Sequence, residues 1–171
     1  MAGRQRRAEP EDAEAIALIY NQGIEDRLAT FEVRPRMTGD VARWFDDGYP
    51  IIVVEDEASV VAWASATPYR AREAYRGVAE FSVYVDRTRR GEGFGRAALS
   101  ALIAESESRG YWKLLSRNFV QNEASRRLCA SLGFREVGIY RRHAKLDGRW
   151  MDCVIVEKLL GEASGATGGS I

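Results

Sequence analysis

Cysteine and histidine are scarce in this chain of 171 residues, which has two of the former and one of the latter. Cys129 and Cys153 give neither a disulfide framework nor a metal-ligand spacing, so we expect two buried free thiols in a reducing compartment. The single histidine, His143, excludes a metal site built on several histidines and leaves one candidate for a Ser-His-Asp triad. It lies in a strand-like segment, where a solvated side chain is expected. We therefore expect no metal.

Long apolar runs and an excess of either charge are also missing. No run approaches the roughly 20 apolar residues that a membrane span needs. The first twelve residues, MAGRQRRAEPED, lack the apolar segment of a signal peptide. Lysine plus arginine equals aspartate plus glutamate, at 25 each, so no overall field favours a nucleic acid or an anionic membrane. These features predict a cytoplasmic protein that binds neither a nucleic acid nor a membrane.

Helix-like and strand-like periods alternate along the chain, whose length suits one domain. The expected order is a strand, two helices (11–22 and 37–48), three strands (50–56, 59–69 and 78–85), a helix ending near Gly110, a strand (111–116), a helix (122–133) and two strands (135–146 and 150–160). The last two strands flank Asp147-Gly148, a strong hairpin signal. Only the middle of this order repeats a βαβ pattern. We predict an α/β domain at 1–161, with a mixed, mostly antiparallel sheet of about seven strands flanked by about four helices, and a disordered tail at 162–171.

The segment RRGEGFG, residues 89–95, places three glycines at alternate positions between a predicted strand and a predicted helix. Free N–H groups at a helix start attract phosphate, and glycine lets the backbone approach an anion closely. Arg89, Arg90 and Arg96 can add charge-assisted contacts. A P-loop would end in Gly-Lys-Ser/Thr, and the dinucleotide fingerprint spaces its glycines differently. The segment thus predicts a phosphate site of another kind, and a glycine-rich turn without a ligand is the alternative.

This segment resembles the signature of the GCN5-related N-acetyltransferases (GNAT), as Arg90-x-x-Gly93-x-Gly95. A second motif of that family, an asparagine followed by a helix and Leu-Gly-Phe, is similar to NEASRRLCASLGF at 122–134. A narrower resemblance covers almost the whole ordered chain. The segments IYNQGI, ATFEVRP, ASATPYRAREAYRGVAEFSVYVD and LDGRWMD are similar to the phosphinothricin acetyltransferase subfamily, and within it to members that act on arsinothricin.

The resemblance implies a GNAT fold, acetyl-CoA as co-substrate and a small amino acid as acceptor. Members of the subfamily acetylate the α-amino group of glutamate analogues that carry a phosphinate, sulfoximine or arsenic group. The true acceptor among these, and whether the role is detoxification or housekeeping, are left open by the sequence. The alternatives are an acetyltransferase for another small amine or a protein N-terminus, and a non-catalytic acyl-CoA-binding sensor.

The resemblance also implies which residues bind the cofactor. The backbone of Val83, Tyr84 and Val85 would bind the pantetheine arm as an added strand does. The diphosphate would be held by the loop Arg90, Gly91, Glu92, Gly93, Phe94, Gly95 and Arg96. Asn122, together with Ser125, would contact the pantetheine from the opposite side. An ordinary N-cap is the alternative for Asn122, and both roles are compatible.

Glu80 is the predicted proton acceptor. Period-two alternation places Glu80, Ser82 and Tyr84 on one face of the strand at 78–85, and a carboxylate in such an apolar strand is costly unless something needs it. For an α-amino group with a pKa of ~8, the neutral form at pH 7 costs only about 1–1.5 kcal/mol. Glu80 therefore needs only to accept a proton, directly or through water. A structural ion pair with a nearby arginine is the alternative.

The acceptor site is predicted to include two arginines of the segment PYRAREAY. Arg70 and Arg72 point the same way if this segment is extended, and two guanidinium groups suit a carboxylate plus a second anionic head group. The resemblance adds Tyr75 as a hydrogen-bonding partner of that head group, and Thr30 and Phe31 as walls of the pocket. A solvated polar loop is the alternative for Arg70 and Arg72.

Two departures from the family pattern bear on the chemistry. Cys129 stands where the family often has a histidine or tyrosine thought to protonate the leaving thiolate, so no acid is assigned between Cys129 and water. Asp26 and Arg27 stand where many phosphinothricin enzymes have small or hydroxylated residues, which leaves the exact substrate open. The long C-terminal hairpin with Trp150, together with the resemblance, predicts a homodimer.

Overall fold

The computed structural model describes residues 3–165. The strands are β1 (Arg4–Arg7), β2 (Ile51–Asp56), β3 (Ser59–Pro68), β4 (Val78–Val85), β5 (Lys113–Phe119), β6 (Arg135–Leu146) and β7 (Arg149–Leu159). The helices are α1 (Ala13–Asp26), α2 (Thr38–Asp46), α3 (Phe94–Ser108), α4 (Glu123–Ser131) and the four-residue α5 (Glu162–Gly165). Three 3-10 turns, η1 (Pro10–Asp12), η2 (Glu73–Tyr75) and η3 (Arg87–Arg89), complete the described part. The predicted α/β class, with seven strands and four longer helices, is confirmed.

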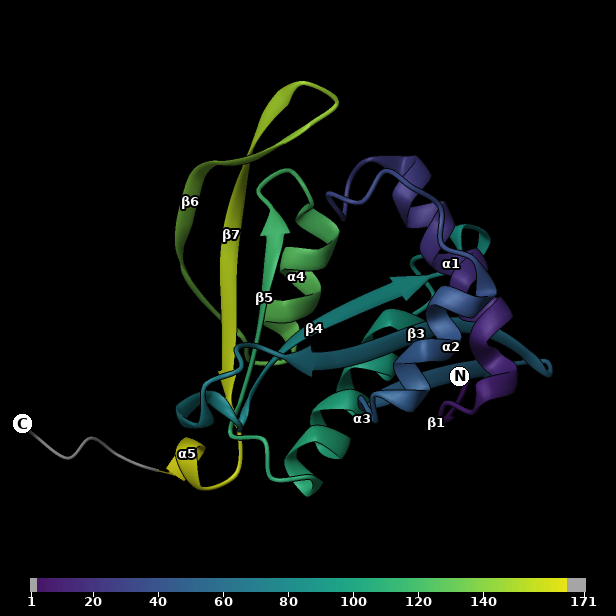
Figure 1. The fold of residues 1–171 in the computed structure, drawn as a ribbon, viewed down its shortest axis with the longest axis horizontal. Helices are drawn as coiled ribbons and strands as arrows, with labels where there is room; N and C mark the ends of the chain where they lie inside the picture. Colours follow the sequence, from purple (N-terminus) through teal and green to yellow (C-terminus); the bar gives the residue numbers. More distant parts are fainter. Residues whose placement is uncertain (1–2, 166–171) are drawn as a thin grey trace, which may run out of the picture.

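The seven strands form one sheet in the order β1-β2-β3-β4-β5-β7-β6 (Figure 1). Every neighbouring pair is antiparallel except β4 and β5, which are parallel. A parallel pair needs a long crossover, and α3 supplies it between these two strands. The predicted mixed, mostly antiparallel sheet is therefore confirmed.

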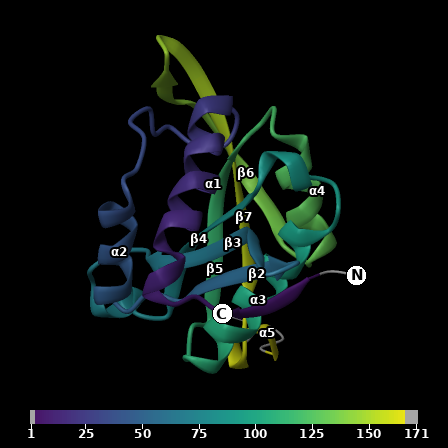
Figure 2. The same ribbon diagram turned by 90° about the vertical axis from the view of Figure 1, so that its right-hand side faces the viewer.

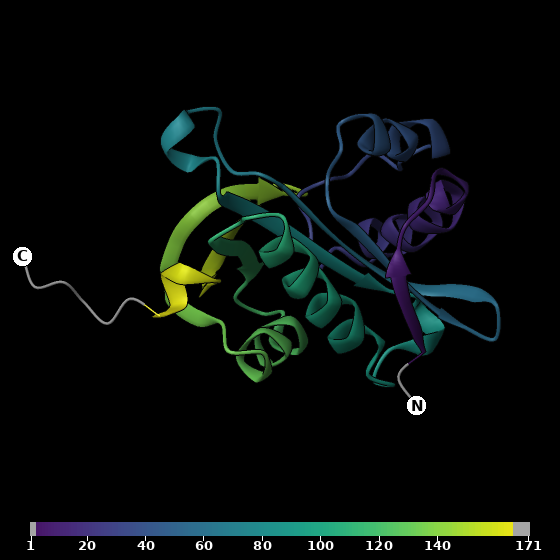
Figure 3. The ribbon, with the colours of Figure 1, turned by 90° about the horizontal axis from the view of Figure 1, so that it is seen from below.

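Helices cover both faces of the sheet: α1 and α2 lie on one side and α3 and α4 on the other (Figures 2 and 3). Strand β2 illustrates how the sheet is buried on both of its faces. Ile52 and Val54 pack in the core under α3, whereas Ile51 and Val53 pack in the core under α1 and α2. A strand buried on both faces reads as a continuous apolar run, as IIVV does.

Strands β4 and β5 stay together over a short distance and then separate. Their register pairs are Val78 with Lys113, Ala79 with Leu114, and Glu80 with Leu115. Beyond these pairs the Oγ of Ser116 donates a hydrogen bond of 3.0 Å to the carbonyl of Phe81, after which the two strands diverge (Figure 1). Strand β5 remains paired with β7 along its whole length. The two strands are therefore separated by a gap in the middle of the sheet, with β4 on one side of the gap and β5 on the other.

The end of the chain was predicted to be a disordered tail from residue 162. Residues Glu162–Gly165 form α5, and residues 166–171 lie outside the described part, so the boundary of the domain stays a prediction. Among residues 3–165, none of the helices has the length and apolar character required to cross a bilayer.

Candidate active site

The space between β4 and β5 is a cleft of about 870 Å³. Its walls come from β4, β5, the connection between α1 and α2, the loop before α3 and the first turn of α4. Because β4 leaves β5 after Glu80, no strand of residues 3–165 lies beside the edge of β4 that faces this cleft, at Val83, Tyr84 and Val85. Its main-chain groups are available to an extended ligand, as in strand addition.

The loop before α3 forms the floor of one end of the cleft. Gly91 and Gly93 have φ values of +82° and +90°, a conformation that residues with a side chain rarely adopt. A Cβ atom built on either glycine would meet no atom within 4 Å, so the backbone here is open. The N–H groups of the first turn of α3 have no intrahelical carbonyl partner. This geometry is suited to an anion, and we call this part of the cleft the anion-binding end.

The charged residues of this loop divide into two groups. Arg90 and Arg96 line the cleft, and Arg96 donates to the Oγ of Ser131 at 2.7 Å. Glu92 and Arg89 instead form an ion pair of 2.9 Å with each other outside the cleft lining. The ring of Phe94 is buried in the core, which leaves only its main chain for a ligand. Of the predicted loop residues, Glu92 and the Phe94 side chain are thus not part of the cleft.

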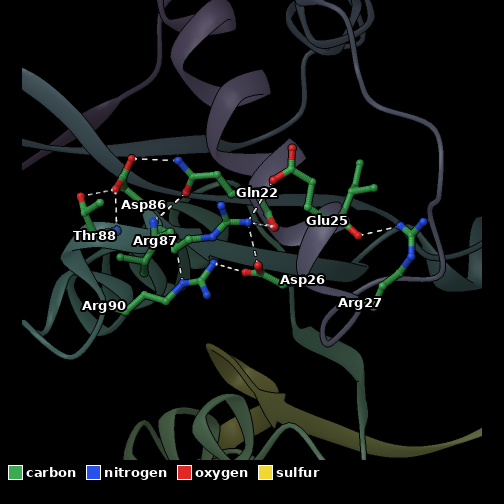
Figure 4. A network of polar contacts seen from close by, with 10 residues as sticks. Gln22, Glu25, Asp26, Arg27, Asp86, Arg87, Thr88 and Arg90 are labelled. Atoms are coloured by element: carbon green, nitrogen blue, oxygen red, sulfur yellow. Dashed lines mark hydrogen bonds and ion pairs between the residues drawn. The ribbon is translucent and has the colours of Figure 1, made fainter.

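Asp26, at the end of α1, contacts the same loop (Figure 4). Its carboxylate lies 2.7 Å from Nη2 of Arg87 and 2.7 Å from Nη2 of Arg90. Burial opposes the charged form of this carboxylate, but the hydrogen bonds from the two arginines outweigh it and hold the pKa of Asp26 below its usual range. The neighbouring Arg27 points elsewhere and pairs with Asp147 in the β6–β7 turn at 2.9 Å. Asp26 therefore belongs to the anion-binding end of the cleft.

The first turn of α4 provides the opposite wall. Asn122 and Ser125 both line the cleft, and the Asn122 side chain accepts a hydrogen bond of 3.2 Å from the N–H of Ser125. This is the N-cap that the sequence analysis gave as the alternative for Asn122. Cys129 lies behind this turn with 1% of its surface exposed, and burial raises the pKa of its thiol. Cys129 is a core thiol, which makes it unsuitable as a nucleophile or as an acid open to the cleft.

At the other end of the cleft Glu80 meets an arginine of β5. Nη2 of Arg117 donates to the two carboxylate oxygens of Glu80 at 2.9 and 3.2 Å. Nη1 of the same arginine lies 3.4 Å from Nε2 of His143, which comes from the bulged part of β6. The alternative for Glu80, an ion pair with a nearby arginine, is therefore present. A carboxylate has about four acceptor sites, so this contact leaves room for a second donor.

The predicted walls of the acceptor pocket lie at this end. Thr30 and Phe31 line the cleft, and the Phe31 ring packs edge-on against Phe119 with centroids 4.8 Å apart. The connection between α1 and α2 thus reaches across to the end of β5. Glu80 and Phe31 come from different elements, so this end of the cleft is lined by both β4 and the connection between α1 and α2.

The three remaining predicted residues do not line the cleft. Arg70, Arg72 and Tyr75 lie in the exposed connection between β3 and β4. Arg70 stacks on the ring of Tyr69 at 5.0 Å, and a hydrogen bond with Tyr69, together with the weaker attraction of Glu80, raises the pKa of Arg70. Tyr75 packs edge-on against Tyr69. The structure therefore places them outside the cleft lining but near the Glu80 end, since the connection begins beside Thr67, the register partner of Glu80.

Arg117 is the residue that the sequence analysis missed. The strand predicted at 111–116 is found at Lys113–Phe119, because β7 pairs with it as far as Cys153. The alternation of β5 puts Arg117 on the same face as Leu115, the register partner of Glu80. An arginine in a strand that follows the strand of Glu80 was the available signal, but the sequence does not show that β4 pairs with β5.

Comparisons with known proteins give the following relationships. Residues 20–134 match the family described as Acetyltransferase (GNAT) family. The chain is 36% identical over 156 residues to a phosphinothricin N-acetyltransferase of Alcaligenes faecalis, which covers 88% of this chain and 79% of that protein. It is 33% identical over 161 residues to an L-methionine sulfoximine/L-methionine sulfone acetyltransferase of Salmonella typhimurium, covering 92% of this chain and 94% of that protein.

A solved structure agrees with these relationships. The phosphinothricin acetyltransferase of Sinorhizobium meliloti, solved in complex with acetyl-CoA, superposes with a TM-score of 0.90 at 30% identity and covers 98% of this chain and 93% of that one. In addition, residues 3–165 contain no group of three or more histidine, cysteine or acidic side chains that could hold a metal ion.

Proposed function

Since the chain belongs to the acetyltransferase (GNAT) family and is an acetyl-CoA-dependent N-acetyltransferase, we propose that its acceptor is the α-amino group of a glutamate-analogue amino acid of the phosphinothricin, methionine sulfoximine or arsinothricin type. One observation carries this proposal. A single cleft has an anion-binding loop at one end and a paired carboxylate and guanidinium, Glu80 and Arg117, at the other. The names of the relatives support the same class of acceptor.

The residues at the anion-binding end fit acetyl-CoA. The open backbone at Gly91 and Gly93 and the first turn of α3 would hold its diphosphate, with Arg90 and Arg96 beside them. The free edge of β4 at Val83–Val85 would align the pantetheine arm, and Asn122 with Ser125 would close it from the α4 side. When bound there, acetyl-CoA supplies the acetyl group as a thioester, which a neutral amine attacks directly.

In this proposal Glu80 binds the amino group and accepts its proton. The acceptor arrives as an ammonium ion, and a carboxylate partner orients it by charge-assisted hydrogen bonding. Loss of that proton leaves the neutral amine that attacks the thioester, and a half-buried carboxylate open to water can accept the proton directly or through water. No covalent enzyme intermediate is required, and the core position of Cys129 supports a direct transfer.

Thr30 and Phe31 would wall the acceptor pocket, and the outer part of the acceptor would reach the exposed connection after β3. Arg70 and Arg72, with Tyr75, would bind its anionic head group from that connection. Arg70 is close enough to Glu80 to feel its charge. A small movement of this exposed connection toward the cleft is part of the proposal.

A homodimer in the cytoplasm completes the proposal. The support for a second copy is the β6–β7 hairpin. Its exposed apolar side chains are Val137, Ile139, Tyr140, Trp150 and Leu159. Strand β6 is at the edge of the sheet, where an apolar surface is costly unless it is covered.

The test is a thiol-release assay with acetyl-CoA and four acceptors: phosphinothricin, methionine sulfoximine, arsinothricin and a peptide with a free N-terminus. We expect the amino acids to be acetylated with the higher specificity constants. Glu80→Gln should lower kcat by about 10²-fold, the usual contribution of a positioned base. Glu123→Gln is the matched control, because Glu123 forms an exposed ion pair with Arg127 outside the cleft.

The other outcomes are distinct. Turnover that is unchanged in Glu80→Gln would remove the proton acceptor. A preference for the peptide would favour a protein N-terminal acetyltransferase. Binding of acetyl-CoA by calorimetry without turnover of any amine would favour a non-catalytic sensor.

A further inference from the structure

The cations that line the cleft are unevenly distributed. Arg90 and Arg96 lie at the anion-binding end, beside the loop before α3. Among the described residues that line the cleft, Arg117 is the one cation at the Glu80 end. Arg70 and Arg72 approach this end only from the exposed connection after β3. An amino acid placed with its nitrogen at Glu80 therefore meets Arg117 first.

Arg117 is held in place but keeps donors for a ligand. Its Nη2 is used by Glu80, and its Nη1 faces the imidazole of His143 at 3.4 Å. A guanidinium has five N–H donors arranged in a planar fork. Within residues 3–165, the Nε of Arg117 has no hydrogen-bonding partner, and 43% of the side chain is exposed. Contacts at both terminal nitrogens orient the group, and the partly exposed side chain lines the cleft.

The direct contact between Glu80 and Arg117 matches the spacing of charges in an α-amino acid. The amino and carboxylate groups of such a molecule are attached to the same carbon atom. Their binding partners on the protein must therefore also be adjacent, with a carboxylate for one and a cation for the other. A fork of N–H donors suits a carboxylate, because two parallel hydrogen bonds can form.

We infer that Arg117 binds the α-carboxylate of the acceptor while Glu80 holds its amino group. This inference rests on the proposed function and adds a specificity-determining residue to it. Arg117 then selects a free α-carboxylate, whereas Arg70 and Arg72 are left to the head group of the acceptor side chain. Peptide N-termini and amines without a carboxylate lack the group that Arg117 binds.

His143 supports this assignment as a positioning residue. Its ring lies 4.9 Å from the ring of Tyr140 and 6.4 Å from that of Phe31, measured between centroids. It contacts Nη1 of Arg117 while Glu80 accepts from Nη2, so the guanidinium is contacted by side chains of two strands, β4 and β6. An oriented guanidinium loses less freedom when it binds a carboxylate.

The experiment compares two acceptors that differ at the proposed contact: an amino acid that the wild-type protein acetylates, and the α-carboxamide of the same amino acid. The wild-type protein should prefer the free acid. In Arg117→Gln the specificity constant for the acid should fall about 10- to 100-fold, the range for a hydrogen bond to a charged group. The constant for the amide should change less than about 3-fold, and calorimetry should show unchanged coenzyme A affinity. Arg127→Gln, which removes an exposed arginine outside the cleft, is the matched control.

Arg117→Lys covers the case in which the glutamine variant does not fold. It keeps the charge but loses the fork, and an intermediate preference for the acid is expected. Equal losses for acid and amide in either variant would overturn the inference, since Arg117 would then act only through Glu80. A wild-type protein that accepts both acceptors equally would overturn it without any variant. Acetylation of peptides but of neither small acceptor would instead refute the proposed function itself.

Discussion

Gly23 in α1 offers a test of how tightly the helix is seated on the strand that borders the cleft. A Cβ atom at this position would lie 2.6 Å from Cε1 and 2.7 Å from Cδ1 of Tyr84 on β4. The Tyr84 ring has little freedom to move away. Its centroid lies 5.0 Å from that of Tyr20 and 5.0 Å from that of Trp63, which is itself buried. Gly23→Ala should therefore overpack this cluster.

The magnitude follows from two opposing terms. Overpacking a well-packed core costs about 1–3 kcal/mol, whereas replacing glycine by alanine inside a helix gains up to about 1 kcal/mol. Gly39→Ala in α2 is the matched control, because a Cβ there meets no atom within 4 Å. The gain in helix propensity is shared by both variants to a first approximation. Their difference in the free energy of unfolding then measures the overpacking, about 1–3 kcal/mol.

Thermal unfolding followed by circular dichroism gives the comparison directly. For a chain of this size the difference corresponds to a melting temperature of Gly23→Ala roughly 2–12 °C below that of Gly39→Ala. Because the main chain of Tyr84 faces the cleft, the KM for acetyl-CoA should also rise in Gly23→Ala and not in the control. Equal melting temperatures would show that the ring of Tyr84 gives way freely, and the argument from packing would be refuted.

Two further predictions concern charge. Asp26→Asn removes a negative charge beside Arg90, so coenzyme A should bind about three-fold more tightly at low salt, and its affinity should fall more steeply as salt is added. Weaker binding in calorimetry would contradict this, because it would mean that the contact holding Arg90 in place matters more than the repulsion between Asp26 and the diphosphate. Asp12 accepts hydrogen bonds from Arg6 at 2.7 and 2.8 Å, and these outweigh its burial and hold the pKa of Asp12 below its usual range. At pH values above the pKa of Asp12 in the unfolded chain, about 4, the lowered pKa of the folded state stabilises the fold. This stabilisation is lost as the pH falls through the pKa of Asp12 in the folded state. The melting temperature should therefore decline more steeply below pH 5 in the wild type than in Asp12→Asn. Parallel curves would contradict this assignment.

Much of the fold could be predicted from the sequence because its signals are local. The continuous apolar run at β2 and the hairpin turn at Asp147-Gly148 depend only on neighbouring residues, and both are found. Alternation also placed Glu80 and Tyr84 on one face of β4. In the structure Tyr84 packs against the core under α1, whereas Phe81 lies in the core on the other face. The end of β5 was predicted too early, because its last residues are held by β7, more than thirty residues away in the chain.

The candidate site divides in the same way. The glycine-rich segment before α3 could be recognised from its local sequence as a candidate phosphate site, and the structure places these glycines at an open helix start. The partner of Glu80 could not be found, because it depends on which residue of β5 stands beside β4. The orientation of Arg70 and Arg72 depends on an exposed connection, whose conformation no local pattern determines.

The divergence of β4 from β5 has a consequence for how this kind of protein changes its preferences. The hollow is made by the path of two main chains, and it would persist if the side chains around it were exchanged. The side chains at the Glu80 end come from separate parts of the fold: Phe31 from the connection between α1 and α2, Arg117 from β5, and His143 from the bulged part of β6. Substitution of a few of these side chains can therefore change which acceptor is preferred, while the main-chain path that forms the cleft stays the same.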